Sequence, residues 1–274
     1  MPGMPSTKSG ICGLCGTPES LLCYSDLMPK AIYRWFRLMS NEPNPLITDG
    51  SNPNPILITK KRTTQKNYQI AEYFLCPKCE DRLNKGGETW VLKNTYRGGE
   101  HFPMRSNLKQ AQLLNRSNGV HLLDVSVLPE FQLSKLIHFA CGIFWKAAAR
   151  KWNSVDNYST QLKLGPYEES FRRYLMNDAP FPAGAALIVN ISGNLKPLMC
   201  SIYPYYEGRT SDTRQYRMAL PGVAFWLHLG HLTDEMKALC AVRNNVVCLV
   251  QNLNAIFLRD GGKLISLSPP LKLR

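Results

Sequence analysis

The spacing of apolar positions changes along the chain, and the change falls near residue 185. Before it, apolar residues recur at helical spacing, most clearly between Leu133 and Trp152. Gly165-Pro-Tyr-Glu-Glu169 has proline and acids where a first helical turn favours them. The pattern predicts helices over 29–39, 105–115, 133–152 and 166–177, and a short helix over 81–91 that Gly86 and Gly87 break.

After residue 185 the apolar runs are short, and Gly, Asn and Pro separate them, as is typical of strands joined by turns. This pattern predicts strands over 185–191, 198–203, 215–220, 223–229, 246–250 and 255–258, a turn over 259–263, and an earlier strand over 56–59. The expected fold class is α+β, with helices and antiparallel strands in the C-terminal part.

A chain of 274 residues accommodates one large domain or two modest ones. The changes in composition suggest a flexible tail (1–10), a cysteine-bearing module (11–100), an accessory α+β domain (101–265) and a loose tail (266–274). No apolar run is long enough to cross a membrane, and the first residues do not resemble a secretory signal. We therefore expect a cytoplasmic protein without a membrane partner.

The chain carries 33 Lys and Arg against 20 Asp and Glu, a formal charge of +13. An excess of this size favours phosphate-rich partners, nucleic acid above all, although a solvated basic surface without a ligand is the plainer alternative. The candidate contacts are Lys30, Arg34 and Arg37 on the first predicted helix, and Lys60, Lys61 and Arg62 in the loop beyond it. Lys146, Arg150 and Lys151 end the helix over 133–152, where the helix dipole favours cations.

Two C-x-x-C pairs stand out among the nine cysteines: Cys12 with Cys15, and Cys76 with Cys79. An odd cysteine count and the absence of a secretory signal argue against a disulfide framework. Two such pairs supply four soft ligands for a tetrahedral Zn²⁺, and four thiolates leave no open position for a substrate. The sequence therefore predicts a structural zinc site, with ordinary buried thiols as the alternative.

The segments around the two pairs carry a resemblance. Leu22-Cys-Tyr-Ser-Asp-Leu-Met-Pro-Lys30 follows the first pair, and Leu75-Cys-Pro-Lys-Cys-Glu80 contains the second, with Asn84 and Glu88 beyond it. This stretch, about residues 10–95, resembles the HNH (His-Me finger) endonuclease superfamily, and in particular HNH-like proteins of bacterial antiphage defence loci. The resemblance implies a treble-clef zinc module, with the four cysteines as its ligands.

The family's catalytic histidine corresponds to Asp26 in this chain. The histidine is a general base that works beside a divalent metal, and a carboxylate with a pKa near 3.9 is a weaker base than imidazole. The resemblance implies that Asp26, Glu80 and Asn84 would hold Mg²⁺ or Mn²⁺. The plain alternative is that Asp26 caps a helix, Glu80 pairs with a surface base and Asn84 lies in a turn.

Two functions stay open at this stage. One is a metal-dependent endonuclease, acting on DNA in antiphage defence. The other is a catalytically degenerate, zinc-stabilised adaptor that binds nucleic acid or a partner protein of a defence complex. A weaker third hypothesis places the function in residues 185–260, which match no motif.

Overall fold

The computed structural model describes residues 8–18, 20–32, 35, 56–58, 63–65, 70–153, 159–210 and 212–266. Within these ranges the chain is α+β and its sheets are mainly antiparallel, as the sequence predicts. No helix in these ranges combines the length and the apolar character that a membrane span requires.

The largest sheet has seven strands in the order β11-β12-β13-β10-β14-β7-β6. The strands are β6 (Gln112–Ser117), β7 (Val120–Asp124), β10 (Ala185–Ser192), β11 (Ile202–Thr210), β12 (Thr213–Leu220), β13 (Val223–Gly230) and β14 (Val246–Val250). β10 pairs antiparallel with β13 and parallel with β14, and every residue of β10 is buried. A strand buried throughout must be covered on both faces of the sheet.

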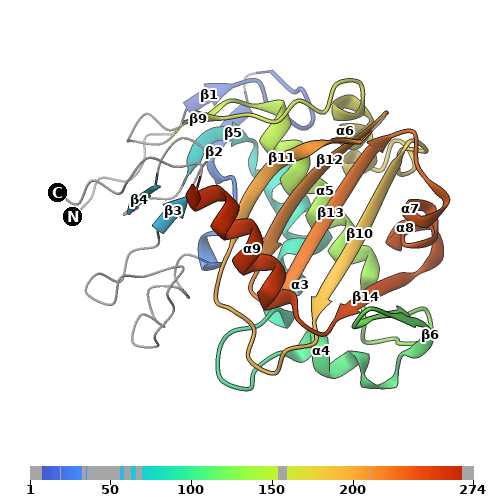
Figure 1. The fold of residues 1–274 in the computed structure, drawn as a ribbon. Helices are drawn as coiled ribbons and strands as arrows, with labels where there is room; N and C mark the ends of the chain where they lie inside the picture. The colour runs from blue at the N-terminus through green and yellow to red at the C-terminus, as the bar shows by residue number, and fades with distance from the viewer. Residues whose placement is uncertain are drawn as a thin grey trace.

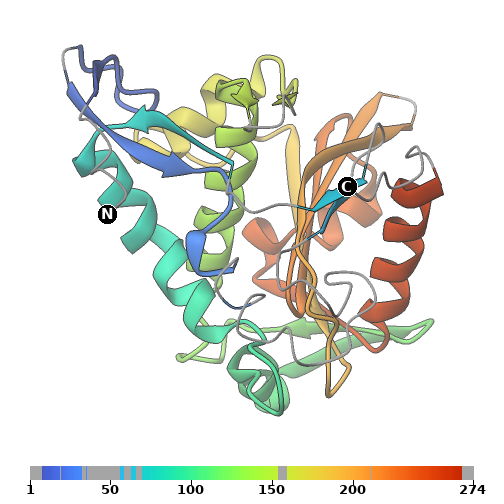
Figure 2. The same cartoon turned by 90° about the vertical axis from the view of Figure 1, so that its left-hand side faces the viewer.

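Helices supply that cover on both faces, as Figure 2 shows with the sheet seen edge-on. α5 (Leu133–Ala149) and α6 (Tyr167–Met176) lie on one side, where Phe139 of α5 packs against Phe225 of β13 with ring centroids 6.0 Å apart. α9 (Leu253–Ser266) lies on the other side (Figure 1). α7 (Asp234–Ala238) and α8 (Ala241–Asn244) lie near the start of β10, where Arg243 donates a hydrogen bond to the Ala185 backbone oxygen.

The predicted helices over 133–152 and 166–177 are confirmed, although α5 ends at Ala149. Four of the predicted strands are confirmed as β10, β12, β13 and β14, whereas the strand predicted over 198–203 begins only at Ile202. The strand over 255–258 and the turn over 259–263 are wrong, because α9 runs through both. Leu253 and Phe257, four residues apart, share the buried face of this helix.

The helix predicted over 105–115 is mostly wrong. α4 (Pro103–Asn107) and a 3₁₀ turn (η2, Leu108–Gln110) occupy its first half, and β6 begins at Gln112. β6 and β7, which the sequence pattern did not predict, form a hairpin through Asn118 and Gly119, both at positive φ. The described residues also form two short pairs: β3 (Ile56–Ile58), near its predicted place, with β4 (Thr63–Gln65), and β8 (Trp152–Asn153) with β9 (Ser159–Thr160).

A second, smaller sheet has the order β1-β2-β5. Its strands are β1 (Lys8–Gly10), β2 (Ser20–Asp26) and β5 (Ala71–Leu75), so the last residues of the predicted N-terminal tail belong to a strand. β5 leads directly into α2 (Pro77–Leu83), a π-helical turn (η1, Asn84–Glu88) and α3 (Thr89–Asn94). The expected break at Gly86 and Gly87 is therefore a π-helical turn in a continuous helical run.

Close packing against α5 explains these two glycines. A Cβ atom on Gly86 would lie 2.2 Å from Cε1 of His138, and one on Gly87 would lie 2.3 Å from the backbone oxygen of Lys135. Only residues without a Cβ allow this approach. The π-helical turn therefore rests directly on the backbone of α5.

The small sheet shares its core with the rest of the chain. Phe74 of β5 packs against Trp145 of α5 and Trp152 of β8, with ring centroids 5.5 Å apart in both pairs. Arg172 of α6 donates a hydrogen bond to the backbone oxygen of Leu14, at 2.8 Å. One continuous set of buried apolar residues reaches from Cys12 to Phe257. The described residues around the two cysteine pairs are thus packed against α5 and α6.

Candidate metal centre and buried carboxylate site

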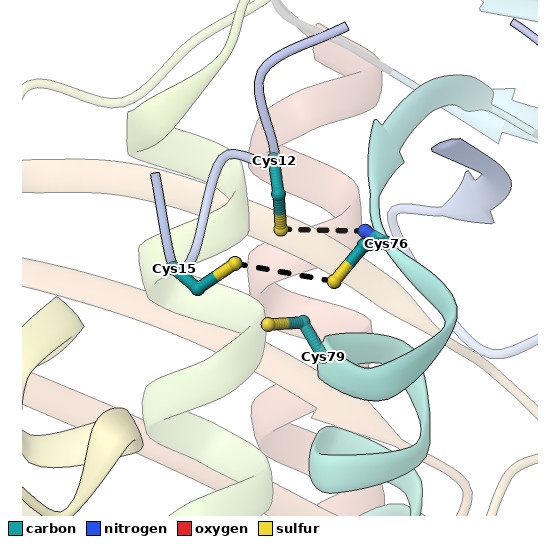
Figure 3. Close-up of side chains that lie close together, drawn as sticks. All are labelled: Cys12, Cys15, Cys76 and Cys79. Carbon is teal, nitrogen blue, oxygen red and sulfur yellow. Dashed lines mark hydrogen bonds between the residues drawn. The ribbon is translucent and has the colours of Figure 1, made fainter. Parts of the chain in front are cut away.

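The two C-x-x-C pairs meet at one point, although about sixty residues separate them in sequence (Figure 3). Cys12 and Cys15 lie in the turn after β1, where the Gly16 N–H donates to the Cys12 backbone oxygen at 2.9 Å. Cys76 directly precedes α2, and Cys79 lies in its first turn. The four sulfur atoms lie within 4.8 Å of one another.

This arrangement fits a tetrahedral zinc ion. With Zn–S bonds of about 2.3 Å, the sulfur atoms of such a site lie about 3.8 Å apart, and the Cys15 and Cys76 sulfur atoms are 3.9 Å apart. The donor set is four thiols, which suits Zn²⁺ and leaves no position for a substrate. The four predicted ligands therefore form a cluster that could hold a structural metal ion such as zinc.

Hydrogen bonds to the sulfur atoms support thiolate character. The Cys76 N–H donates to the Cys12 sulfur at 3.3 Å, and the Thr17 hydroxyl lies 3.0 Å from the Cys15 sulfur. Burial acts to raise the pKa of Cys15, but hydrogen bonds from Thr17 and neighbouring thiols outweigh it and lower the pKa to about 6. Burial raises the pKa of Cys12 and Cys79, a cost that a bound dication would offset.

Asp26 ends β2, close to the helical run that begins with α2. Burial raises the pKa of its carboxyl to about 6, the charges of Lys146 and Lys30 act to lower it, and those of Glu88 and Glu80 raise it further. The Asp26 charge in turn raises the pKa of Tyr203 on β11, for which burial is the main cause. Asp26 thus lies where the small sheet, α5 and β11 approach one another.

From the sequence, the helix dipole alone explained Lys146, but the structure gives this residue a buried position and a specific partner. Its side chain is only 4% exposed, and Nζ donates a hydrogen bond to the backbone oxygen of Asp26 at 2.7 Å. A buried ammonium is costly unless charges or hydrogen bonds compensate it. Because the Lys146 charge acts on both Asp26 and Glu88, it is the central cation of this cluster.

Glu80 and Glu88 approach Asp26 from the helical run. Glu80 accepts a hydrogen bond from the Ser25 hydroxyl at 2.9 Å, which links α2 to β2. Burial raises the pKa of Glu88, and the nearby Glu80 charge adds to the effect. Residues eight apart in an α-helix differ by about 80° around the axis, but the one extra residue of a π-helical turn reduces this to about 20°. The turn therefore places both glutamates on one face.

Asn84, the third residue of the predicted catalytic set, lies between these glutamates at the start of the π-helical turn and is partly buried. Its N–H continues the helix to the backbone oxygens of Glu80 and Asp81. In the described part of the chain, the ligand atoms of three or more Cys, His, Asp or Glu residues come within 4.8 Å of one another at the four thiols. The carboxyl groups of Asp26, Glu80 and Glu88 are not gathered this tightly.

Of the predicted nucleic-acid contacts, Lys30 is exposed and its charge acts on Asp26. Arg34, Arg37, Lys60, Lys61 and Arg62 lie outside the described residues. Glu88, Lys146 and Tyr203 were missing from the predicted site. A lysine in a helical segment that is apolar on nearly every side was the available signal for Lys146, whereas nothing in the sequence indicated Tyr203.

Comparisons with protein families, with curated proteins and with solved structures find no match for this chain.

Proposed function

We propose that this chain is an HNH-like, zinc-containing effector that binds nucleic acid and hydrolyses its phosphodiester bonds at Asp26. The observation that carries the proposal is the position of Asp26 at the end of β2, a strand that contacts the helix bearing the second cysteine pair through Ser25 and Glu80. The turn that holds Cys12 and Cys15, the antiparallel pair of β2 and β5, and α2 come in this order along the chain, which supports an arrangement similar to a treble clef. The structural zinc would fix the small sheet against that helix.

The raised pKa of Asp26 answers the main chemical objection to an aspartate in place of histidine. A carboxylate with an ordinary pKa near 3.9 is a poor base at neutral pH, but one near 6 approaches imidazole, at about 6.5. Buried carboxyl groups with raised pKa values are frequent at catalytic sites. In this proposal the ionised Asp26 accepts a proton from the attacking water molecule, whose oxygen bonds to phosphorus as the bond from phosphorus to the leaving sugar oxygen breaks. The leaving oxygen takes its proton from solvent water.

A divalent metal does not fit the site as it is arranged. Carboxylate and amide oxygens from Asp26, Glu80 and Asn84 are suitable ligand types for Mg²⁺ or Mn²⁺. However, the carboxyl groups do not surround a common point, and Lys146 already places a positive charge among them. No step of the proposed hydrolysis is therefore assigned to Mg²⁺ or Mn²⁺.

A cleavage assay on supercoiled plasmid and on single-stranded circular DNA tests this function, with Mg²⁺, Mn²⁺ or a chelator that spares the zinc. We expect Asp26→Ala to lower cleavage about 10²- to 10⁴-fold, the usual contribution of a general base. Asp81→Ala is the matched control, because Asp81 is exposed on α2 and its salt bridge to Lys85 (2.8 Å) lies outside the cluster. Equal cleavage by wild type and Asp26→Ala would contradict the proposal, as would inactive wild-type protein.

One observation favours the second candidate, an adaptor that binds nucleic acid or a defence protein without cutting. Lys146 neutralises the carboxylates from within the protein, as expected where a former metal site has become structural. An adaptor would bind DNA, with an affinity that falls steeply with salt, and would not nick plasmid. Protection of cells against phage that survives Asp26→Ala would also support the adaptor.

A further inference from the structure

Two tyrosines form an outward-facing pair on the small sheet. Tyr24 of β2 and Tyr73 of β5 are direct partners across the strands, and their rings lie 5.2 Å apart at an interplanar angle of 60°. Tyr24 is 56% exposed, whereas the next residue, Ser25, is 1% exposed and points toward α2. The face of the sheet that carries Tyr24 therefore presents an aromatic ring to solvent.

This face leads directly to Asp26. Side chains two residues apart on a strand point to the same side, so Tyr24 and Asp26 share a face about 7 Å apart. On the neighbouring strand, Tyr73 pairs with Tyr24 and Ala71 pairs with Asp26. A planar group stacked on Tyr24 would lie one step along the strand from the carboxyl group.

We propose that Tyr24 and Tyr73 form a stacking platform for the unpaired bases of a single-stranded nucleic acid, and that the platform positions the strand's backbone at Asp26. The inference rests on the proposed function and narrows its substrate to single strands. Every base presents a flat face that stacks on an aromatic ring, whereas in a duplex these faces are already covered by neighbouring bases. The charge of +13 and the exposed Lys30 beside Asp26 favour a polyanion.

A purely structural role would explain less. Aromatic pairs across strands stabilise a sheet, which accounts for the contact between the rings. It does not account for the exposure of Tyr24, because a ring that only supports the fold gains most when it is covered. Leu21, also on β2 and 55% exposed, provides a comparison of similar exposure without an aromatic face.

The test is a binding titration with fluorescently labelled oligothymidylate and oligouridylate of about 15 nucleotides, and with a DNA duplex of the same length. We expect both single strands to bind more tightly than the duplex. Tyr24→Ala should weaken binding of single strands about 5- to 150-fold. Tyr24→Phe keeps the ring and should stay within about twofold, and Leu21→Ala should bind like wild type.

Wild-type affinity in Tyr24→Ala, equal losses in Tyr24→Ala and Tyr24→Phe, or a preference for the duplex would each overturn the platform. Asp26→Asn separates this result from the proposed function, because it removes the base and leaves the tyrosines in place. Single-strand binding that depends on Tyr24 in a protein that never cleaves would support the platform and refute the hydrolysis. Cleavage that depends on Asp26 but not on Tyr24 would support the hydrolysis and refute the platform.

Discussion

The small sheet and the seven-stranded sheet are stabilised in different ways. Every residue of β10 is buried, and apolar side chains cover both faces of the strand. The small sheet has only three strands, and Ile11, Leu21 and Tyr24 at its surface are exposed. Its ties to the remainder are the cysteine cluster, the packing of Phe74 and polar contacts such as that of Ser25 with Glu80. Apolar burial holds the large sheet, whereas the small sheet adds the cysteine cluster and polar contacts to the apolar core that it shares with α5.

The difference predicts that metal removal is the largest single perturbation, and that it acts locally. Chelation or Cys79→Ser should release β1, β2 and β5 while β10 to β14 stay folded, because zinc contributes about 10–16 kcal/mol in isolated zinc-finger peptides. Hydrogen exchange before and after chelation measures this, together with the zinc content. Cys23→Ser is the control, since Cys23 lies outside the four-thiol group. Equal protection of both sheets from hydrogen exchange after chelation would contradict this difference between them.

The second prediction concerns the contact between the π-helical turn, which continues from the small sheet, and α5, which covers the large sheet. Gly87→Ala should destabilise the protein by about 1–3 kcal/mol, because the new methyl group meets the backbone of Lys135 and cannot be accommodated by a side-chain rotation. Gly142→Ala is the matched variant inside α5, where the nearest atoms lie 3.7 Å away. It should stabilise α5 by about 0.5–1 kcal/mol. Chemical denaturation of both variants gives the two signs, and a loss in both would show that α5 tolerates no added methyl.

The third and smallest effect is a pH dependence of opposite sign in the two regions. Asp26 has a raised pKa, about 6 against 3.8, so the folded state holds its proton more tightly and stability falls as pH rises from about 4 to 6. Burial, followed by the Arg217 charge, lowers the pKa of His228 on β13 to about 4, so this group makes stability rise with pH up to about 6.5.

Asp26→Asn isolates the first contribution. Above pH 6 the variant should be more stable than wild type by about 1–2 kcal/mol, below the full value of roughly 3 kcal/mol because the carboxyl is partly solvated. The gain should disappear below about pH 4, where the wild-type carboxyl is protonated in both states. Thermal unfolding at pH 4 and pH 8 checks this, and a gain that is equal at both pH values would contradict it.

The sequence indicated local features well and long-range ones poorly. Both C-x-x-C pairs and α5 were predicted because their signals lie within a few residues or a few helical turns. Residues 255–258 were predicted as a strand because a short apolar run fits either period, and only packing against the sheet identifies α9. The pKa of Asp26 depends on burial by distant segments, and the role of Lys146 depends on the fold that brings its side chain to β2.

The π-helical turn over Asn84–Glu88 also suggests how such a site can be recognised in other sequences. A π-helical turn contains one residue more than an α-helical turn and commonly marks a single-residue insertion. In a relative without the extra residue, the helix would continue as an ordinary α-helix, with the positions of Glu80 and Glu88 seven residues apart in sequence. An alignment without a gap would not match both acids to Glu80 and Glu88, because their spacing differs by one residue. An alignment gap of one residue between two conserved acids would identify it.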